Sequence, residues 1–471
     1  MTDGAASLLS RHLSSSPLEL STRSVLESAF SRLTSRDPSQ AWTSGQWMTE
    51  RKGGSDVSGT ETIAKKADVP LQGKGVDGSP LGPYSISGFK WFSSATDANM
   101  AVLLARTHSG RLSAFYAPMR RTIAGSSAEI ELNGVTIQRL KSKLGTRTLP
   151  TAELVLNDMR GYMLGQEGDG VREISTLLNV TRIHNAVTAV GCWGRGLSIS
   201  RAFARVRIVS GRRLTDIPAH VATMASQHVE YRGWMHLTFF TVLLLGMSEQ
   251  QPASSLTYLS SNTSPSLAKL QPSHSDTKAL LRVLTPITKA LTAKAAIAGL
   301  AECMESLGGI GYLENEDMAF NVARLFRDAN VLSIWEGTTD IMASDMLRVL
   351  KGNQGPEALQ VLEAWLQRVG GQKAMPLRER WRIWVARVRG AGLQELQVAG
   401  REVMLELGRV LAGVLLFVDA ERDDDEVAAE IARRWTSGVD ASTNWKEKVK
   451  WDRRIVFGND TSEHQAAGLK L

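Results

Sequence analysis

A single carboxylate, Glu336, carries the strongest chemical signal in this chain of 471 residues. It lies in the segment Ser333-Ile-Trp-Glu-Gly-Thr-Thr-Asp-Ile-Met342, between a bulky apolar pair and a Gly-Thr-Thr sequence. Apolar neighbours raise the pKa of a carboxyl group, because desolvation disfavours the charged form. Such a carboxylate can be the base that removes a weakly acidic C–H proton. The simpler interpretation is a capped helix preceded by an exposed acid, and this segment alone favours it.

The residues after Glu336 predict the start of a helix. Gly337 lets a backbone or a ligand approach closely. Thr338 and Thr339 can cap the helix, and a helix N-terminus with free N–H groups also attracts anions. The apolar residues that follow recur at helical spacing: Ile341, Met342, Met346 and Val349.

Three further segments present polar groups that could bind a ligand. In Gly45-Gln-Trp-Met-Thr-Glu-Arg-Lys-Gly-Gly-Ser-Asp-Val-Ser-Gly-Thr-Glu-Thr62, a Gly-Gly-Ser-Asp turn leaves N–H groups and a hydroxyl exposed after a strand. Such groups can bind a carbonyl or a phosphate. A second segment, Gly88-Phe-Lys-Trp-Phe-Ser-Ser94, is a strand that ends in aromatic and hydroxyl residues. The third is Gly308-Gly-Ile-Gly-Tyr312, followed by Arg327-Asp328.

A change of periodicity divides the elements that position these segments. Residues 47–160 contain short alternating or apolar runs between turn residues, without helices between them, which predicts an antiparallel barrel or sandwich. From about residue 168 the period is helical, with one helix over 171–190 and a second after Pro218. The expected strands include residues 84–92, 100–105, 112–117 and 151–157.

A Ser-rich connector at 248–275 precedes a long helix. Pro286 is expected to kink that helix or to mark its start, and the glycines at 308–311 stop it. One face of the helix carries Leu280, Leu284, Ile287, Leu291, Ala295 and Ala298.

The two ends of the chain differ in pattern. Residues 352–471 predict further amphipathic helices at 358–369 and 393–418, and the acidic run at 421–426 predicts a solvated loop or a helix start. Residues 1–46 are Ser-rich, with one helical patch at 25–33, and are too few to form a domain of their own.

Composition bounds the class of protein. A hydrophobic fraction of 43% with 22% charged residues is typical of a globular chain, and no apolar run is long enough to span a membrane. The net charge of +7 fits nucleic acid, an anionic membrane, a nucleotide or coenzyme A, or an uninvolved basic surface. Cys192 and Cys303 cannot form a disulfide framework and indicate a reducing compartment. Cys and His show no metal-ligand spacing, so no metal site is expected.

The four motifs, taken in this order, resemble the acyl-CoA dehydrogenase family over roughly residues 40–350. The opening Gly-Gln-Trp-Met-Thr-Glu, the segment Gln138-Arg-Leu-Lys-Ser-Lys-Leu-Gly-Thr-Arg147 and the extra C-terminal helices are most similar to its alkylation-response, AidB-like branch. The resemblance implies an α+β fold with a middle antiparallel β-domain at 47–160 and a C-terminal four-helix bundle at 161–351. Additional helices would occupy 352–471, and 1–46 would be a remnant of an N-terminal helical domain.

The resemblance also implies a function and a set of site residues. Glu336 would take the α-proton of an acyl-CoA thioester while hydride passes from the β-carbon to N5 of FAD. Ser55 and Arg182 would contact coenzyme A. The expected FAD contacts are Met48, Thr49, Trp91, Ser93, Arg207, Gly308, Gly309 and Thr338. Ile334 and Trp335 would form an apolar wall that keeps water from the reduced flavin. The implied partners are electron-transfer flavoprotein or oxygen as acceptor, and further copies of this chain in a homodimer or homotetramer.

Several positions depart from the family pattern. Only about 46 residues precede the β-domain that carries the Gly-Gly-Ser-Asp turn, so most of the front domain is expected to be missing, exposing apolar surface and impairing activity. Ser210, in Arg207-Ile-Val-Ser-Gly211, replaces an aromatic residue that covers the adenine. Asp340 stands where an amide is common, and a negative charge near a pyrophosphate is unfavourable unless it points away. Glu305 replaces a common Gln, as it tends to do in the AidB-like branch.

Two alternatives to the enzyme remain open. The first is a flavin-binding module that associates with DNA through the basic stretch at 366–413, although ion-paired, solvated helix faces explain that stretch better. The second is an inactive fragment that binds no FAD. The chain is expected to be intracellular, with cytoplasm, mitochondrion and peroxisome not distinguished.

Overall fold

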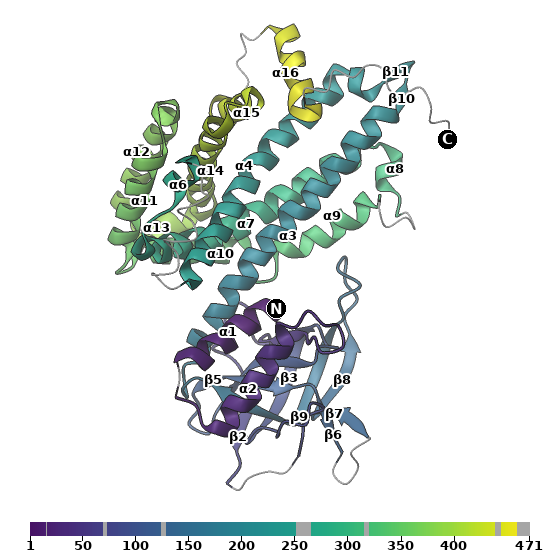
Figure 1. Cartoon of the computed structure of the whole chain (residues 1–471), viewed down its shortest axis with the longest axis vertical. Helices are drawn as coiled ribbons and strands as arrows, with labels where there is room; N and C mark the ends of the chain where they lie inside the picture. Colours follow the sequence, from purple (N-terminus) through teal and green to yellow (C-terminus); the bar gives the residue numbers. More distant parts are fainter. Residues whose placement is uncertain are drawn as a thin grey trace. The chain divides into compact units, whose positions relative to one another are not determined.

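The computed structural model describes residues 1–15, 17–68, 73–123, 129–250, 265–314, 320–438 and 444–458 (Figure 1). The chain forms two compact units, Met1–Arg182 and Ile183–Leu471. The boundary falls within one continuous helix, α3 (Gly170–Val206), so this helix contributes to both units. The predicted change to a helical period near residue 168 is confirmed.

The seven-stranded sheet of the first unit closes on itself as a β-barrel. Strand β9 pairs antiparallel with both β3 and β5, and β4 pairs with β5. Strand β1 pairs antiparallel with β3 and parallel with β4, so the ring β3–β1–β4–β5–β9 returns to β3. The sequence prediction of a barrel or sandwich is confirmed as a barrel. The strands are β1 (Ser44–Trp47), β2 (Ile63–Lys66), β3 (Tyr84–Ser94), β4 (Met100–Arg106), β5 (Leu112–Pro118), β8 (Val135–Leu140) and β9 (Thr151–Leu164). A separate pair consists of β6 (Arg120–Thr122) and β7 (Ile130–Leu132).

Strand β4 is buried on both faces. Ala101 and Leu103 point into the barrel interior, whereas Met100, Val102 and Leu104 belong to an outer core. A strand buried on both faces reads as a continuous apolar run, which explains why this segment lacks polar alternation.

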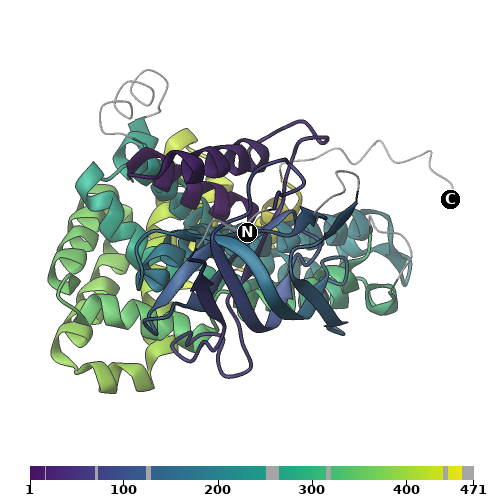
Figure 2. The same cartoon turned by 90° about the horizontal axis from the view of Figure 1, so that it is seen from below.

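The outer core is completed by two N-terminal helices, α1 (Thr2–Ser15) and α2 (Leu20–Leu33). Figure 2 shows this pair, drawn in purple, lying across one side of the barrel. Leu8 and Leu9 of α1 and Leu26 of α2 are at most 1% exposed and share the outer core with the residues of β4. The expectation of one helical patch at 25–33 was therefore incomplete. The expected exposure of apolar surface was wrong for this side of the barrel, because α1 and α2 cover it.

The second unit is helical and has one large core. Trp193 of α3 packs edge-to-face on Tyr231 of α4 and contacts Gly299 of α7. Helices α7 and α10 pack on each other, and α14 packs on α4, α7 and α10. The first group of elements is α4 (Pro218–Glu249), α6 (Pro265–Leu270), α7 (His274–Ser306), α8 (Gly309–Tyr312), α9 (Val322–Asn330), the 3-10 turn η2 (Val331–Ser333) and α10 (Thr339–Lys351). The second group is α11 (Gly355–Val369), α12 (Met375–Gly390), α13 (Leu393–Val398), α14 (Gly400–Asp423), α15 (Glu426–Ser437) and α16 (Trp445–Phe457).

Helix α7 runs through Pro286 without ending, and it starts at His274 with Ser273 as its cap. A proline inside a helix costs about 3 kcal/mol. Burial of Leu284 and Ile287, both 0% exposed, offsets that cost. Within the described residues, α7 is the one helix long and apolar enough to cross a membrane, and 78% of that apolar window is buried inside the protein.

Sequence predictions of helix ends were mostly confirmed. Helix α4 starts at Pro218, and α7 ends just before Gly308, whose φ is 63°. The acidic run ends one helix and starts the next, because Asp425 accepts a hydrogen bond from Val427 N at the start of α15. The expected helix at 393–418 is broken at Ala399 into α13 and α14. Of the expected Ser-rich connector, residues 251–264 lie outside the described residues.

Candidate functional site

Glu336 lies in a strained loop between η2 and α10. Its φ is 60°, and that of Gly337 is 109°. The left-handed conformation costs a residue with a side chain about 1–3 kcal/mol and persists only where the surroundings enforce it. The Glu336 side chain is half-buried. The loop therefore fixes the backbone of Glu336 at the expense of conformational energy.

Two buried polar side chains enforce the loop. Lys289 of α7 is 0% exposed and donates a hydrogen bond from Nζ to the carbonyl of Gly337, at 2.5 Å. Asn185 of α3 is 4% exposed, accepts from Trp335 Nε1 at 2.5 Å and donates to the carbonyl of Leu332 at 3.1 Å. Sequence reasoning named neither residue. Lys289 could have been found as a lysine in the middle of an apolar helical segment. A lysine buried in this way needs a polar partner.

The two apolar residues before Glu336 differ in burial. Ile334 is 62% exposed within this unit. Trp335 is partly buried against the core, as a wall residue would be. Thr338 is the N-cap residue of α10, but its exposed side chain makes no capping hydrogen bond.

A second group of expected residues lies together on the barrel. The backbone N–H of Trp91 donates to the carbonyl of Thr49 at 2.9 Å, which joins the Met48–Thr49 segment to strand β3. Met48 is buried and Thr49 is half-buried. Ser93, also on β3, is 0% exposed. A cross-strand contact thus joins the two segments that carry Met48, Thr49, Trp91 and Ser93.

Two buried polar atoms of this group lack a protein partner. Neither Ser93 Oγ nor Gln46 Oε1 has a hydrogen bond to any residue in the described part of the chain. The two residues are backbone neighbours, because Gln46 on β1 is in register with Ser94, the residue after Ser93 on β3. Leaving a buried polar group unsatisfied costs about 1–3 kcal/mol, so each of these atoms points to a polar ligand. Gln46 was not among the expected residues, although it belongs to the quoted motif.

Positive charge surrounds the ring of Trp91. Lys141 Nζ lies 3.2 Å from the ring centroid, and the Arg51 guanidinium carbon lies 5.1 Å from it. Lys141 also forms an ion pair of 2.6 Å with Glu153. A ligand placed against this surface meets cations, which favours negative charge on that ligand.

The remaining expected residues are placed as follows. Ser55 is exposed in the turn after β1, and Arg182 is half-buried on α3. Gly308 and Gly309 have open space where a side chain would start, so a ligand could reach their backbone. Arg207 is exposed beside the hairpin of β10 (Ile208–Val209) and β11 (Arg212–Arg213). Ser210, with a φ of 50°, forms the turn of that hairpin.

The second unit separates its expected residues into two sets. Ser306, near Gly308, donates a hydrogen bond to Ser200 of α3, so the end of α7 lies beside the end of α3 that leads to Arg207. Lys289, which holds the Glu336 loop, lies about 25 Å back along α7, since each helical residue rises 1.5 Å. Glu336 and Thr338 thus form one set, and Arg207, Gly308 and Gly309 form another.

The negative charge of Asp340 is paired. Both of its carboxylate oxygens accept from Arg401 of α14, at 2.6 and 2.7 Å. The hydrogen bond from Arg401, together with its charge, lowers the pKa of Asp340, and this outweighs the opposing effect of burial. The expected repulsion between Asp340 and a pyrophosphate is therefore reduced.

The basic stretch at 366–413 consists largely of paired arginines. Arg368, Arg378 and Arg380 donate to backbone carbonyls, of Gln271, Gly370 and Thr436 respectively. The others form ion pairs with carboxylates: Arg382 with Glu379, Arg387 with Glu406, Arg389 with Glu363, Arg401 with Asp340, and Arg409 with Glu230. The interpretation of ion-paired helix faces is confirmed.

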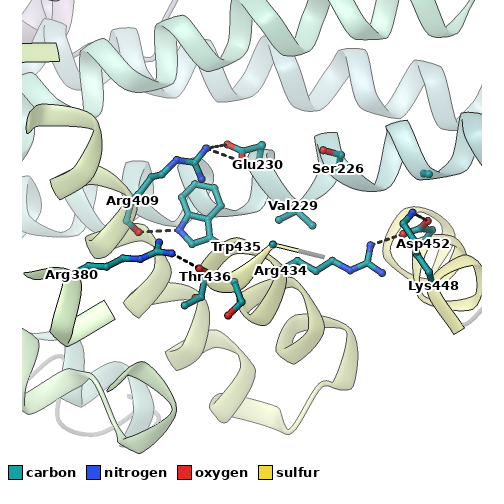
Figure 3. A pocket seen from close by; sticks show the side chains of 13 residues that line it. Ser226, Val229, Glu230, Arg380, Arg409, Arg434, Trp435, Thr436, Lys448 and Asp452 are labelled. Carbon is teal, nitrogen blue, oxygen red and sulfur yellow. Dashed lines mark hydrogen bonds and ion pairs between the residues drawn. The ribbon is translucent and has the colours of Figure 1, made fainter. Parts of the chain in front are cut away.

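A cavity of about 580 Å³ lies among the C-terminal helices (Figure 3). Its charged residues already have protein partners. Arg409 pairs with Glu230 and lies over Trp435, 4.7 Å from the ring centroid. Arg434 and Lys448 both pair with Asp452. These bonds connect α4 with α14 and α15 with α16, so the cavity is explained as a by-product of a structural ion network.

Neither cysteine is placed for thiol chemistry. Burial raises the pKa of the Cys303 thiol to about 12 and also raises that of Cys192. Of the residues that the structure describes, no three His, Cys, Asp or Glu side chains are placed to hold a metal ion.

Comparison with known proteins identifies the family. Residues 45–159 match the model of the acyl-CoA dehydrogenase middle domain, and residues 168–351 match that of the acyl-CoA dehydrogenase C-terminal domain. Acyl-CoA dehydrogenase family member 11 of Caenorhabditis elegans is 35% identical over 98% of this chain and 72% of that protein. The chain belongs to the acyl-CoA dehydrogenase family, whose members are FAD-dependent oxidoreductases.

The comparisons also bear on the expected branch. The putative acyl-CoA dehydrogenase AidB of Escherichia coli is 33% identical, but over 66% of this chain and 49% of that protein. A crystal structure of C. elegans ACDH-11 in complex with C11-CoA has a TM-score of 0.73 and 33% identity, covering 98% of this chain and 75% of that one. The AidB-like assignment was therefore too narrow, because the C. elegans protein matches nearly the whole chain.

Proposed function

We propose that this chain is an FAD-dependent acyl-CoA dehydrogenase in which Glu336 removes the α-proton of an acyl-CoA thioester. The observation that carries the proposal is the strained loop at Glu336, which buried Lys289 and Asn185 hold in place. Backbone strain enforced by buried polar groups clusters at functional sites. The family relationship supplies the reaction class.

The residues of the barrel fit a flavin. Ser93 Oγ and Gln46 Oε1 are buried without protein partners and would be satisfied by polar atoms of an isoalloxazine ring. When bound, FAD supplies the hydride acceptor. Met48, Thr49 and Trp91 would hold the ring against β3, where Lys141 and Arg51 provide positive charge.

The second set would bind the other end of FAD. Open space at Gly308 and Gly309 admits a phosphate to the backbone, and Arg207 offers an exposed guanidinium. Because this set lies about 25 Å along α7 from the Glu336 loop, we assign it to the FAD of a neighbouring copy of the chain. The end of α3 and the hairpin beside Arg207 expose apolar side chains that association would cover: Val206 at 71%, Ile208 at 59% and Val209 at 42%. A homodimer or homotetramer follows from this assignment.

The protein residues contribute orientation and proton transfer. Glu336 accepts the α-proton, and its fixed backbone limits the positions the carboxylate can reach. We assign Thr338 to the cofactor, and Ser55 and Arg182 to the coenzyme A part of the substrate. Electron-transfer flavoprotein, or oxygen, would reoxidise the flavin.

The absorbance spectrum of the purified protein, before and after anaerobic addition of acyl-CoAs, tests the function. C11-CoA is the first to try, because the C. elegans ACDH-11 structure contains it. We expect a flavin band that bleaches with at least one acyl-CoA. A flavin band that never bleaches would favour a binding module, and the absence of flavin in reconstituted protein would contradict the cofactor assignment.

A further inference from the structure

A fully buried ion pair lies next to the proposed flavin contacts. Lys90 of β3 is 0% exposed, and its ammonium lies 2.7 Å from Oε1 of Glu50, which is 5% exposed. Lys90 also donates to the carbonyl of Leu104 on β4 at 2.8 Å. One cation thus bonds to two other segments of the barrel.

The carboxylate of Glu50 also has further hydrogen-bond donors besides Lys90. Its Oε1 accepts from the Thr62 hydroxyl at 2.6 Å, and its Oε2 accepts from the backbone N–H of Glu61 at 2.6 Å. Burial alone would raise the pKa of this carboxyl, but Lys90 and these hydrogen bonds outweigh it and hold the pKa below its usual value. The pair is therefore a complete network, with partners on both sides.

The Glu50–Lys90 ion pair is adjacent in sequence to the proposed flavin contacts. Glu50 directly follows Thr49, and Lys90 directly precedes Trp91. Successive side chains of a strand point to opposite faces, so an inward Lys90 places Trp91 on the other face of β3. The backbone bond from Trp91 to Thr49 lies beside the ion pair. The ion pair and this backbone hydrogen bond therefore both join the segment of Met48 and Thr49 to the segment of Trp91 and Ser93.

Stability does not explain why a charged pair occupies this position. Removing two charges from water costs roughly what their attraction returns, and well-packed apolar residues often stabilise a core as much or more. A buried ion pair does fix orientation, because its directional hydrogen bonds determine how the two joined segments lie relative to each other.

We propose that Glu50 and Lys90 are positioning residues that hold the Met48–Thr49 segment and the Trp91–Ser93 segment in the geometry that binds flavin. The proposal rests on the proposed function. It predicts that an apolar pair can replace Glu50 and Lys90 in folding but not in flavin binding.

The test compares the double variant Glu50→Leu/Lys90→Met with the wild type. Three quantities are measured: the Tm of the apoprotein, the Kd for FAD on reconstitution of apoprotein, and the visible circular dichroism of the bound flavin. We expect a Tm within a few degrees of the wild type, a Kd for FAD at least tenfold weaker, and an altered dichroism spectrum. Wild-type Kd and dichroism in the double variant would overturn the proposal.

A second variant covers the case in which the double variant fails to fold. Thr62→Val removes one hydrogen bond to Glu50 and keeps the ion pair. We expect the Kd for FAD to weaken about twofold to fivefold with little change in Tm. An unchanged Kd in Thr62→Val would then count as the overturning result.

A matched control separates flavin binding from general stability. Arg434 and Asp452 form another buried ion pair, with side chains 6% and 2% exposed, on α15 and α16 of the second unit. Arg434→Met/Asp452→Leu should leave the Kd for FAD unchanged, whatever its Tm. If the wild type binds no FAD, the proposed function fails as well. If the wild type binds FAD and the double variant Glu50→Leu/Lys90→Met binds it with the same Kd, only the positioning role is overturned.

Discussion

The ammonium group of Lys289 donates a hydrogen bond to the carbonyl oxygen of Gly337, the residue after Glu336, across 48 positions of sequence. This contact connects the buried centre of α7 to the strained loop that carries the proposed base. A helix packed on several sides moves little, so it is a firm support for a loop that would otherwise relax.

Lys289→Met should therefore impair catalysis more than cofactor binding. We expect kcat to fall about tenfold to a hundredfold, because small misplacements of a reacting group cost about that much. Flavin content should stay at the wild-type level. Lys294→Met is the matched control, since Lys294 is exposed on the same helix. A kcat unchanged by Lys289→Met would show that the loop does not need this support.

Glu336→Gln should stop flavin reduction without releasing the flavin. The amide has nearly the shape of the carboxylate but cannot accept the α-proton, and a general base contributes about 10²- to 10⁴-fold. Rapid mixing with acyl-CoA under anaerobic conditions measures the rate. Asp340→Asn serves as the control, because Asp340 is an exposed acid at the start of the next helix. Full reduction of flavin by Glu336→Gln would remove Glu336 from its role.

Arg207→Ala should weaken flavin retention. Loss of a charge-assisted contact with a phosphate costs about 1.5–3 kcal/mol, which is roughly a tenfold to hundredfold change in Kd. The ratio of flavin to protein absorbance after gel filtration reports the loss. Arg212→Ala, on the other strand of the same hairpin, should have a smaller effect. Equal flavin content in both variants would argue against the assignment of Arg207.

His228 should make the protein less stable as the pH falls. Burial, with smaller contributions from Arg201 and Arg232, lowers the pKa of this imidazole to about 3. Between about pH 6.5 and 3, the unfolded chain binds a proton at His228 and the folded chain does not. The free energy of unfolding therefore decreases as the pH is lowered through this window, by up to about 1.4 kcal/mol per pH unit from this group.

The His228→Gln variant checks this assignment. Its Tm should depend less steeply on pH than that of the wild type between about pH 6.5 and 5, where wild-type unfolding is measured most easily. His108, which is exposed on a turn of the barrel, provides the control variant His108→Gln. Parallel Tm profiles for the wild type and His228→Gln would mean that this histidine titrates normally in the folded protein.

Local signals in the sequence predicted much of the fold. Apolar runs of strand length and the Gly308 stop are encoded within a few residues, and β3, β4, β5 and β9 formed where they were expected. Residues 1–46 were harder, because serines interrupt the apolar spacing of α1 and its stabilising contacts are tertiary: packing in the outer core and ion pairs of Arg11 and His12 with Glu173. At Pro286 the error was the opposite. A kink or a helix start was expected there, but α7 continues through it, because burial of its neighbours in the core outweighs the local cost of the proline.

The candidate site was predictable only where its motifs are contiguous. Glu336 and the cross-strand group at Thr49 and Trp91 could be named from short segments. The contacts of Lys289 with Gly337 and of Asn185 with Trp335 span 48 and 150 positions, and no local pattern encodes such separations. The ion pair of Asp340 could not be predicted for the same reason, because its partner Arg401 lies on a distant helix.

The last strand of the barrel has a consequence for synthesis of the chain. Strand β9 pairs with β3, β5 and β8, so a ribosome must release residues 151–164 before the ring can close. Until then, β3 and β5 each present an unpaired edge to the surrounding solvent. We therefore expect nascent chains that end before residue 150 to be the species most prone to aggregate and most dependent on chaperones.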